Sequence, residues 1–387
     1  MAALPCPGAT PNVVAWGAGT NVAHPPDFNN YGQSMVSANL SNAVQVAGGW
    51  RHSLDLRTNG SIFGWGDSTF GQTFFPPGPY MAIAAGQLHS LGLRTDSQVV
   101  AEGDDYWGQC EVPTNLSNVV AVAGGFYHSL ALKSDGTVVA WGTSTNIATI
   151  GTDPSYGQSI VPTNLSGVVA IAAGGWHSMA LKANGTLQGW GRNDSLQADV
   201  PTSVSNIVAI SAGAAHNLAL RADGTVAAWG QNTYGQTNVP ASLSNVVAIA
   251  AGGWHSLALK SDGTVVAWGA GGPSTNANVA CGQNVVPAGL TNVIQVAAGS
   301  VHSLGLIGTN RPATSAMMTG PTFATNTFSV SVPTRNGRVY RLEYKESLNE
   351  TNWTTLPLKA GTGGDLVLTD PGGAGASAQR FYRVRQW

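Results

Sequence analysis

The chain has 387 residues, of which 43% are hydrophobic and only 9% are charged, and its formal net charge at pH 7 is −2. Lysine and arginine form no run, which argues against the basic surface stripe that a nucleic-acid-binding protein needs. No apolar stretch is long enough to span a bilayer as a helix.

The N-terminal segment, residues 1–11, begins MAALPCPGAT. It lacks the basic start and the long apolar core of a signal peptide. Two interpretations therefore stay open: a cytoplasmic protein, or an exported protein whose leader is missing from this chain. The 50 glycines and the low charge are typical of exported proteins, so we expect a secreted or cell-surface location.

From residue 12 to residue 310 one unit recurs seven times, with a period near 39 residues. Each copy has a histidine, and in five copies a Trp-Gly pair follows it thirteen residues later, with Glu102-Gly103 as a variant in a sixth. The last histidine, His302, has no such pair after it, and the first pair, Trp16-Gly17, has no histidine before it. The two unpaired halves complete each other, which indicates a ring closed by the N-terminal strand. The histidines are His52, His89, His128, His177, His216, His255 and His302.

The clearest copy, residues 234–269, divides into short strands. NVVAIAAG is a small-residue strand suited to a crowded axis, and HSLALK alternates between two faces. The turn SDG leads into TVVAWG, and GQTNVP is expected to be a short outer fourth strand. The fold class is therefore all-β, a seven-bladed β-propeller closed by its N-terminal strand.

After residue 310 the repeat stops. Residues 311–319 are expected to be a linker, and residues 320–387 contain five or six further strands separated by Gly, Asp and Pro turns. We expect this tail to fold separately as a small β-sandwich. It is either a compact accessory domain or a sorting, attachment or carbohydrate-contacting domain.

The GQxxVP, VxAIAAG, HSLALK and VxAWG segments resemble the regulator-of-chromosome-condensation repeat family, and are similar above all to its bacterial branch of propeller-type β-lactamase inhibitors. The tail, with its terminal RFYRVR, resembles the β-sandwich appended to many exported bacterial proteins. The resemblance implies a propeller from a bacterium. It also implies that aromatic residues at one strand corner bind a protein partner.

The repeated histidines do not predict a metal or catalytic centre, because seven equivalents spread the groups around the whole ring. We expect each to be packed in the core with a hydrogen bond to backbone. Cys6, Cys110 and Cys281 have no metal-ligand spacing and are expected to be isolated small residues. No metalloprotease, nucleophile-elbow, phosphate-loop or dithiol motif occurs. The sequence predicts no cofactor, no metal and no enzymatic activity.

The copies differ most in two places, and both are candidate binding positions. One is the residue pair before each histidine, where large aromatics either cap the blade ends or form a contact surface. The other is the loop after each Trp-Gly pair, which is long in residues 18–31, 143–156 and 270–281. The candidate binding residues are Trp50, Arg51, Asp67, Phe70, Asp104, Asp105, Tyr106, Trp107, Phe126, Tyr127, Trp176, Arg192, Tyr234 and Trp254.

Three functions remain open on the sequence alone. The first is a non-enzymatic binding propeller that engages a protein partner. The second is a structural component of an extracellular or surface assembly, with self-association. The third is an enzyme in the central cleft, such as a polysaccharide lyase, which would need a buried carboxylate or lysine with a shifted pKa.

Overall fold

The computed structural model describes residues 12–18, 31–37, 40–143, 155–271, 281–308, 316–324, 327–373 and 380–387. The predicted long loops and the proposed linker fall largely or wholly outside these ranges. The described part of the chain is all β-structure and contains no helix capable of crossing a membrane.

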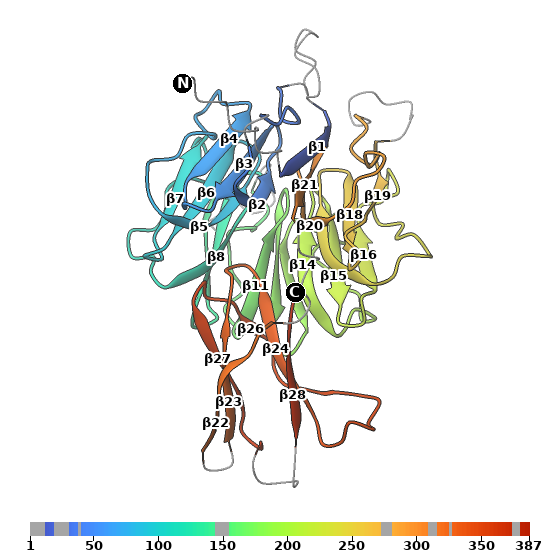
Figure 1. Ribbon diagram of the computed structural model, residues 1–387. Helices are drawn as coiled ribbons and strands as arrows, with labels where there is room; N and C mark the ends of the chain where they lie inside the picture. The colour runs from blue at the N-terminus through green and yellow to red at the C-terminus, as the bar shows by residue number, and fades with distance from the viewer. Residues whose placement is uncertain are drawn as a thin grey trace, which may run out of the picture.

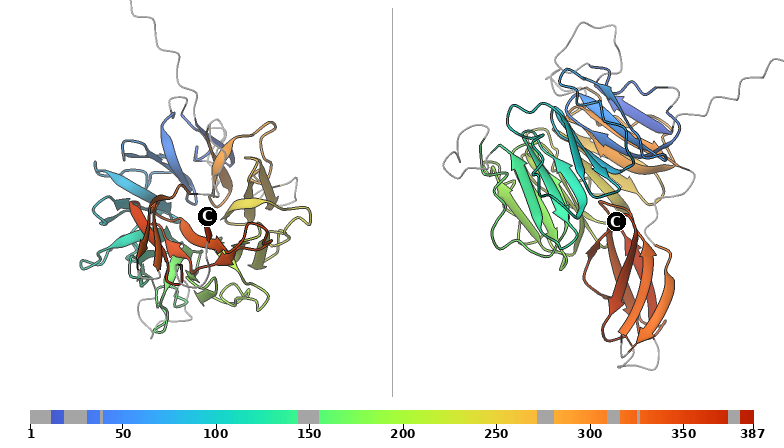
Figure 2. Two further views of the ribbon diagram at one scale, coloured as in Figure 1. Left: turned by 60° about the horizontal axis from the view of Figure 1, so that its bottom comes forward. Right: turned by 90° about the vertical axis from the view of Figure 1, so that its left-hand side faces the viewer.

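Seven three-stranded antiparallel sheets stand around a common axis as the blades of a propeller (Figures 1 and 2). Each blade consists of an inner, a middle and an outer strand. Blade 1 is β2 (Ala43–Gly48), β3 (His52–Arg57) and β4 (Ile62–Gly66); blade 2 is β5 (Tyr80–Ala85), β6 (His89–Arg94) and β7 (Val99–Gly103); blade 3 is β8 (Val119–Gly124), β9 (His128–Lys133) and β10 (Val138–Gly142); blade 4 is β11 (Val168–Ala173), β12 (His177–Lys182) and β13 (Leu187–Gly191). Blade 5 is β14 (Ile207–Ala212), β15 (His216–Arg221) and β16 (Val226–Gly230); blade 6 is β17 (Val246–Ala251), β18 (His255–Lys260) and β19 (Val265–Gly269); blade 7 is β20 (Val293–Ala298), β21 (His302–Ile307) and β1 (Val13–Gly17).

Blade 7 confirms the predicted closure of the ring. Strand β1 pairs antiparallel with β21, with Val13 opposite Leu306 and Gly17 opposite His302. The indole Nε1 of Trp16 donates to the backbone oxygen of Gln283 at 2.9 Å, although the two residues are 267 positions apart in the sequence. The first strand thus supplies the outer strand that the last repeat lacks.

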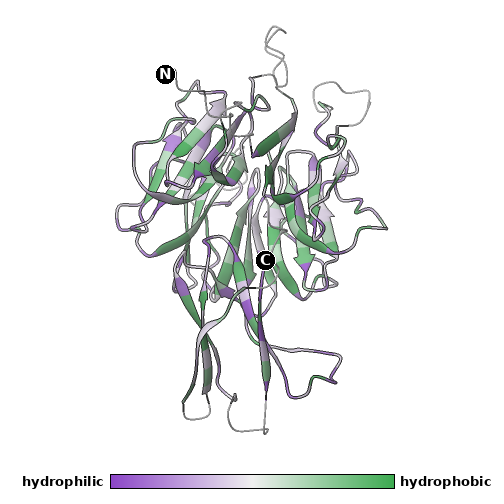
Figure 3. Ribbon diagram, viewed as in Figure 1, coloured by the Kyte–Doolittle hydropathy of each residue, from purple (hydrophilic) through white to green (hydrophobic). Residues whose placement is uncertain are grey.

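The residue types found in the blade strands follow from how closely neighbouring blades pack. The middle strands are buried along nearly their whole length because neighbouring blades cover both faces; β9 and β18 are examples. At the axis only small residues fit beside the histidines. A Cβ added to Gly49 would lie 2.2 Å from Cε1 of the His52 ring, so a side chain there is excluded. The blade strands are accordingly largely hydrophobic (Figure 3).

The expected fourth strand does not form, and this prediction was wrong. In blade 5, for example, the segment after the outer strand is a turn, in which Asn238 N donates to Gly235 O and Gly235 has a φ of +78°. The side-chain oxygen of Gln236 accepts the Tyr234 N–H at 2.9 Å. A backbone held by its own turn and by a side chain, and followed by Pro240, cannot supply a regular ladder.

The C-terminal strands form two further sheets that share one core. One sheet contains β22 (Thr319–Ala324), β23 (Thr327–Pro333) and β27 (Asp365–Asp370); the other contains β24 (Val339–Lys345), β25 (Thr354–Thr355), β26 (Lys359–Ala360) and β28 (Phe381–Gln386). Phe328 and Leu368 from the first sheet are buried in one cluster with Tyr340 and Val384 from the second. Two sheets packed on a common core make a sandwich.

This sandwich lies against the propeller face that carries the turns between middle and outer strands, which we call the turn face (Figures 1 and 2). Three of its side-chain or backbone donors reach backbone carbonyls of consecutive blades. Asn336 Nδ2 donates to Val120 O at 2.7 Å, Leu358 N to Ala183 O at 2.9 Å, and Arg385 Nη1 to Ala222 O at 3.1 Å.

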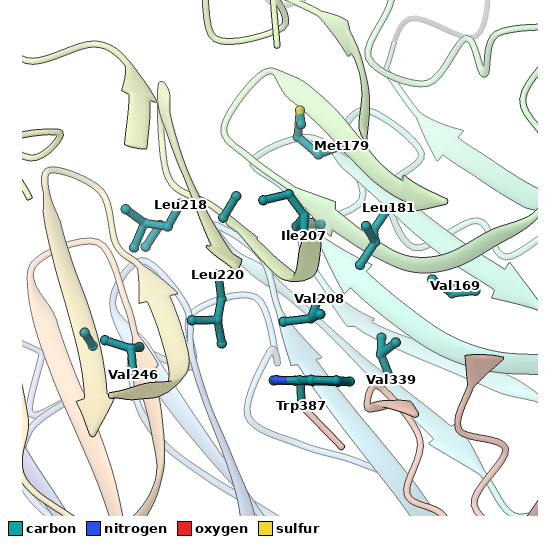
Figure 4. Close-up of a cluster of buried hydrophobic side chains, with 14 of the residues drawn as sticks. Val169, Met179, Leu181, Ile207, Val208, Leu218, Leu220, Val246, Val339 and Trp387 are labelled. Carbon is teal, nitrogen blue, oxygen red and sulfur yellow. The ribbon is translucent and has the colours of Figure 1, made fainter. Parts of the chain in front are cut away.

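The C-terminal residue, Trp387, is the apolar centre of this contact. It is 5% exposed and is buried in one cluster with Val339 of the sandwich and Val208 and Leu220 of blade 5 (Figure 4). Arg341 and Arg385 hold their guanidinium groups 5.0 and 4.7 Å from its ring centre. The sandwich is therefore docked through a buried aromatic side chain as well as through polar contacts.

Trp387→Ala is expected to weaken this docking by about 3–5 kcal/mol, the usual cost of truncating a large buried aromatic. The propeller retains its own ring of contacts, so the variant should show a new, separate melting transition for the sandwich in calorimetry. Phe323→Ala, at an exposed position of β22, is the matched control. A single unchanged transition for Trp387→Ala would contradict the assignment of Trp387 as the docking anchor.

Candidate functional site

The propeller face opposite the sandwich carries the corners between inner and middle strands, and we call it the corner face. The loops after the outer strands begin on this same face, because Asp67 N donates to Arg51 O and Arg192 N donates to Trp176 O. The two regions in which the repeats differ most therefore come together on one surface. The sandwich covers part of the turn face, where it contacts blades 3 to 5, and the corner face points away from it.

A closed ring of side-chain hydrogen bonds lies beneath the corner face. Each histidine bonds through Nε2 to the residue that follows the histidine of the next blade, with N···O distances of 2.8–3.1 Å. That residue is a serine in six blades and Asn217 in blade 5. His302 completes the ring by bonding to Ser53 of blade 1. The expected bond from histidine to backbone was wrong, because the imidazole reaches the neighbouring blade instead.

The neighbouring bonds fix the histidine tautomer. Ser53 Oγ donates to Gln33 O at 2.9 Å, and so accepts from His302 Nε2–H. The Asn217 copy obeys the same rule, since its Nδ2 donates to Gln197 O and its Oδ1 faces His177 Nε2 at 2.8 Å. In the blades where this holds, Nδ1 is then the unprotonated ring nitrogen. In all seven histidines Nδ1 is buried with no partner among the described residues. Burial lowers the pKa of six of them to about 3 and of His177 to about 4.

The predicted aromatic residues gather into a connected cluster on the corner face, centred on Phe126. Its ring lies 4.7 Å from that of Trp176, 6.3 Å from that of Tyr127 and 6.5 Å from that of Trp50. Tyr127 in turn contacts Trp107 at 6.4 Å. We call Trp50, Trp107, Phe126, Tyr127 and Trp176 the aromatic cluster; all but Trp107 are half-buried, and Trp107 is 39% exposed.

Two arginines from different positions of the repeat flank this cluster. The Arg51 guanidinium lies 4.3 Å from the Trp50 ring centre and donates to the Tyr31 hydroxyl at 3.0 Å. The Arg192 guanidinium lies 5.0 Å from the Trp176 ring centre and pairs with Asp194. Each arginine therefore stiffens a tryptophan by stacking on it.

Two residues of this surface were missed by the sequence analysis. Tyr31 and Tyr156 each precede a Gly-Gln pair whose glutamine is buried, and lie 4.7 and 5.0 Å from the guanidinium groups of Arg51 and Arg192. The same position carries Phe70, Trp107 and Tyr234 in other blades. An aromatic recurring before Gly-Gln was the available signal, because the glutamine side chain accepts that residue's N–H and fixes its position.

The remaining predicted residues lie on the same face but outside the cluster. Trp254 is half-buried on blade 6 and takes part in no ring contact within the described ranges. Tyr106 is 81% exposed beside Trp107, and Phe70 is 49% exposed. Asp104 accepts from Gln109, Asp105 accepts from Cys110 N, and Asp67 caps Thr69, so these three carboxylates serve local turns. Most of the three long loops falls outside the described residues.

An axial cavity of about 100 Å³ opens at the centre of the corner face. The glycine and alanine ends of the seven inner strands form most of its wall. Trp50 and Phe126 line it, whereas Tyr127, Trp176 and Trp254 do not. The other larger side chains in the wall are Gln87 and Ser300.

The described residues contain no group of three His, Cys, Asp or Glu side chains suited to a metal ion. Cys110 and Cys281 are free thiols, and burial raises the pKa of Cys110 to about 12, which makes it a poor nucleophile. Cys6 lies outside the described residues. In blade 2 the usual tryptophan is Glu102, whose pKa burial raises.

The comparisons with known proteins agree with this geometry. The Regulator of chromosome condensation (RCC1) repeat matches residues 43–72, 119–146, 168–197, 207–236 and 246–272. A comparison with curated protein sequences finds no match.

Among solved structures, Prp20p of Saccharomyces cerevisiae, described with its binding to Gsp1p and histones, is 20% identical, with a TM-score of 0.61 over 77% of this chain and 91% of that one. The same yeast protein bound to Kap60 is 19% identical, with a TM-score of 0.59 over 80% and 95%. The ectodomain of the Arabidopsis thaliana receptor kinase ACR4 is 17% identical, with a TM-score of 0.52 over 69% and 94%. At these identities the likeness concerns the fold. The chain carries regulator-of-chromosome-condensation repeats, and they build its propeller.

Proposed function

We propose that this propeller is a non-enzymatic binding protein that engages a protein partner through the aromatic cluster on its corner face. The observation that carries the proposal is the connected set of half-buried aromatic rings on the one propeller face that the sandwich leaves free. Tryptophan, tyrosine and arginine dominate the energetic centres of protein interfaces, and here they occur together. The yeast propeller with the same kind of repeat binds Gsp1p, histones and Kap60, all of which are proteins, and this supports a protein as the partner.

The surface is also suited to binding by its stiffness. Arg51 and Arg192 stack on Trp50 and Trp176, and Phe126 is held between three other rings. Side chains that are already ordered lose little conformational entropy when a partner covers them. The blade-5 corner has Ala214-Ala215 and the blade-7 corner has Ser300-Val301, so the surface is lopsided, and Trp254 stands apart as a separate anchor.

Truncation of an aromatic anchor is expected to weaken partner binding by about 2 kcal/mol or more, roughly 30-fold, with little loss of stability. The variants are Trp50→Ala, Trp176→Ala and Trp254→Ala, and their melting temperatures are measured before any binding assay. Each is then used as bait against culture and surface fractions of the source cell. Phe323→Ala, an exposed aromatic on the sandwich, is the control.

Two outcomes would count against the proposal. A loss of about 3–5 kcal/mol in stability for both Trp176→Ala and Trp254→Ala would identify these residues as caps of the blade ends. Retention of the same captured protein by all three variants would place the interface elsewhere. A concentration-dependent dimer that the variants abolish would instead favour self-association in an assembly.

A further inference from the structure

Two polar groups in the wall of the axial cavity have no partner. Gln87 is 6% exposed and Ser300 is 5% exposed, and both line the cavity. Gln87 Oε1 and Ser300 Oγ are buried without a hydrogen bond from any described residue. Buried polar groups are nearly always paired, and an unpaired one raises the question of what completes it.

The backbone around the cavity offers few further donors. Seven inter-blade hydrogen bonds form a second closed belt just above the histidine ring, in which Trp50 N donates to Gln87 O, Gln87 N to Gly125 O, and so on to Ser300 N, which donates to Gly49 O. The N–H groups of these corners are therefore already used. Within the described residues the cavity wall also contains no acidic or basic side chain. The cavity thus lacks a counter-charge for either an anion or a cation.

The rest of the wall is apolar and stiff. The Trp50 and Phe126 rings stack at 6.5 Å with an interplanar angle of 17°, and the methyl groups and Cα atoms of the inner strands complete the enclosure. A volume of about 100 Å³ holds a group of three to four heavy atoms. The matching ligand is therefore small and neutral, has a short apolar part, and both donates and accepts hydrogen bonds.

We propose that the axial cavity is a socket for a primary carboxamide, presented by an asparagine or glutamine side chain of the protein partner. The amide NH₂ pairs with Gln87 Oε1, the amide oxygen accepts from the Ser300 hydroxyl, and the methylene packs beside Trp50 and Phe126. A half-turn of the Gln87 amide exchanges its oxygen and nitrogen and lets it meet either end of the guest. This inference rests on the proposed function and names the chemical group at the centre of that interface.

The socket is tested on the full chain with small probes, independently of any partner. Propionamide is titrated while the backbone amide signals of Gly49, Gly86 and Gly125 are followed by ¹H–¹⁵N NMR. Propionate, propylammonium and butanone serve as isosteres that alter the charge or remove the donor. Propionamide is expected to give saturable shifts with a Kd about tenfold below those of the isosteres, the effect of one buried hydrogen bond.

Three variants sharpen the test. Gln87→Leu should abolish the preference for propionamide, and Gln87→Glu should transfer it to propylammonium. Ser300→Ala should weaken propionamide binding without harming the fold, because blade 5 already has Ala214 at this position. Gln231→Leu makes the same kind of change elsewhere on the corner face and should leave binding unchanged. Melting of each variant is measured first, and Ser300→Ala decides the matter if Gln87→Leu fails to fold.

Equal binding of all four probes, or undiminished propionamide binding by a folded Ser300→Ala variant, would overturn the socket. So would the absence of any saturable shift. These failures leave the proposed function standing if Trp176→Ala still loses its captured partner. Conversely, selective propionamide binding in a protein whose aromatic variants retain their partner would separate the socket from the proposed interface.

Discussion

Acidification from pH 7 to pH 5 is expected to unfold the propeller. Burial lowers the pKa of six ring histidines from 6.5 to about 3, and of His177 to about 4. Above pH 6.5 the histidines are neutral in both the folded and the unfolded chain, and the ring keeps its full stability. Below pH 6.5 the histidines of the unfolded chain take up protons, whereas those of the folded ring stay neutral. Protonation in the folded ring would place an N–H on the buried Nδ1, which has no acceptor within the described residues.

The expected effect is large because the seven groups act together. Each histidine lowers the free energy of unfolding by about 1.4 kcal/mol per pH unit below 6.5, so the ring loses about 14 kcal/mol at pH 5. That matches the whole stability of an ordinary domain, about 5–15 kcal/mol. Asp55 offsets about 1 kcal/mol of this loss of unfolding free energy. Burial raises its pKa to about 6, so on acidification it takes up a proton in the folded chain before it does so in the unfolded chain.

Urea unfolding followed by circular dichroism at pH 7.5, 6.5, 6.0 and 5.5 measures this loss. The slope of unfolding free energy against pH should approach the equivalent of about five to six protons below pH 6, which is the uptake by seven histidines less that by folded Asp55. His302→Gln should lower that slope by one. Asp135→Asn is the control, because the pKa of Asp135 lies at about 2 and does not titrate in this range. A protein that keeps its pH 7 stability at pH 5 would contradict the assigned ring.

Deletion of residues 1–17 is expected to open the ring. It removes all five residues that pair with β21, including the buried Val13 and Trp16. Loss of Trp16 alone is worth about 3–5 kcal/mol, and the bare edge of β21 becomes a template for another strand. The truncated chain should melt well below the full chain and should self-associate in light scattering.

A chain that begins at residue 12 is the matched control, because it keeps β1 and should melt like the full protein. A synthetic peptide of residues 12–18 added to the truncated chain should restore part of the stability by occupying the vacated edge. Equal melting of the two truncated chains would show that β1 contributes nothing to closure.

The fold could be predicted from the sequence because the same pattern of short strands recurs in every repeat. The unpaired Trp16-Gly17 and His302 identified the closing strand, and the small residues of the first strands identified the axis. The acceptor of each histidine could not be found this way, because Ser53 and Ser90 meet His302 and His52 only after the blades are arranged in a ring. A pattern within one repeat does not reveal contacts between repeats.

The candidate site was predictable in part for the same reason. Trp50, Phe126 and Trp176 were found because their pairs vary at a fixed corner, whereas Tyr31 and Tyr156 were hidden beside loops of different length. Docking of the sandwich left no signal, since its partners on the propeller include the backbone carbonyls of Val120, Ala183 and Ala222, which any residue offers. The predicted domain boundaries, export and bacterial origin stay predictions.

The sandwich also makes the two halves of the propeller different in their contacts. Its contacts at Val120, Ala183 and Ala222 clamp three consecutive blades, 3 to 5, into one block. None of these three hydrogen bonds reaches blade 6, 7 or 1, and blade 7 is the one made from both ends of the repeat region. These contacts of the sandwich therefore join blades within one half of the ring, whereas the strand pairing that closes the ring, between β1 and β21, lies in the other half.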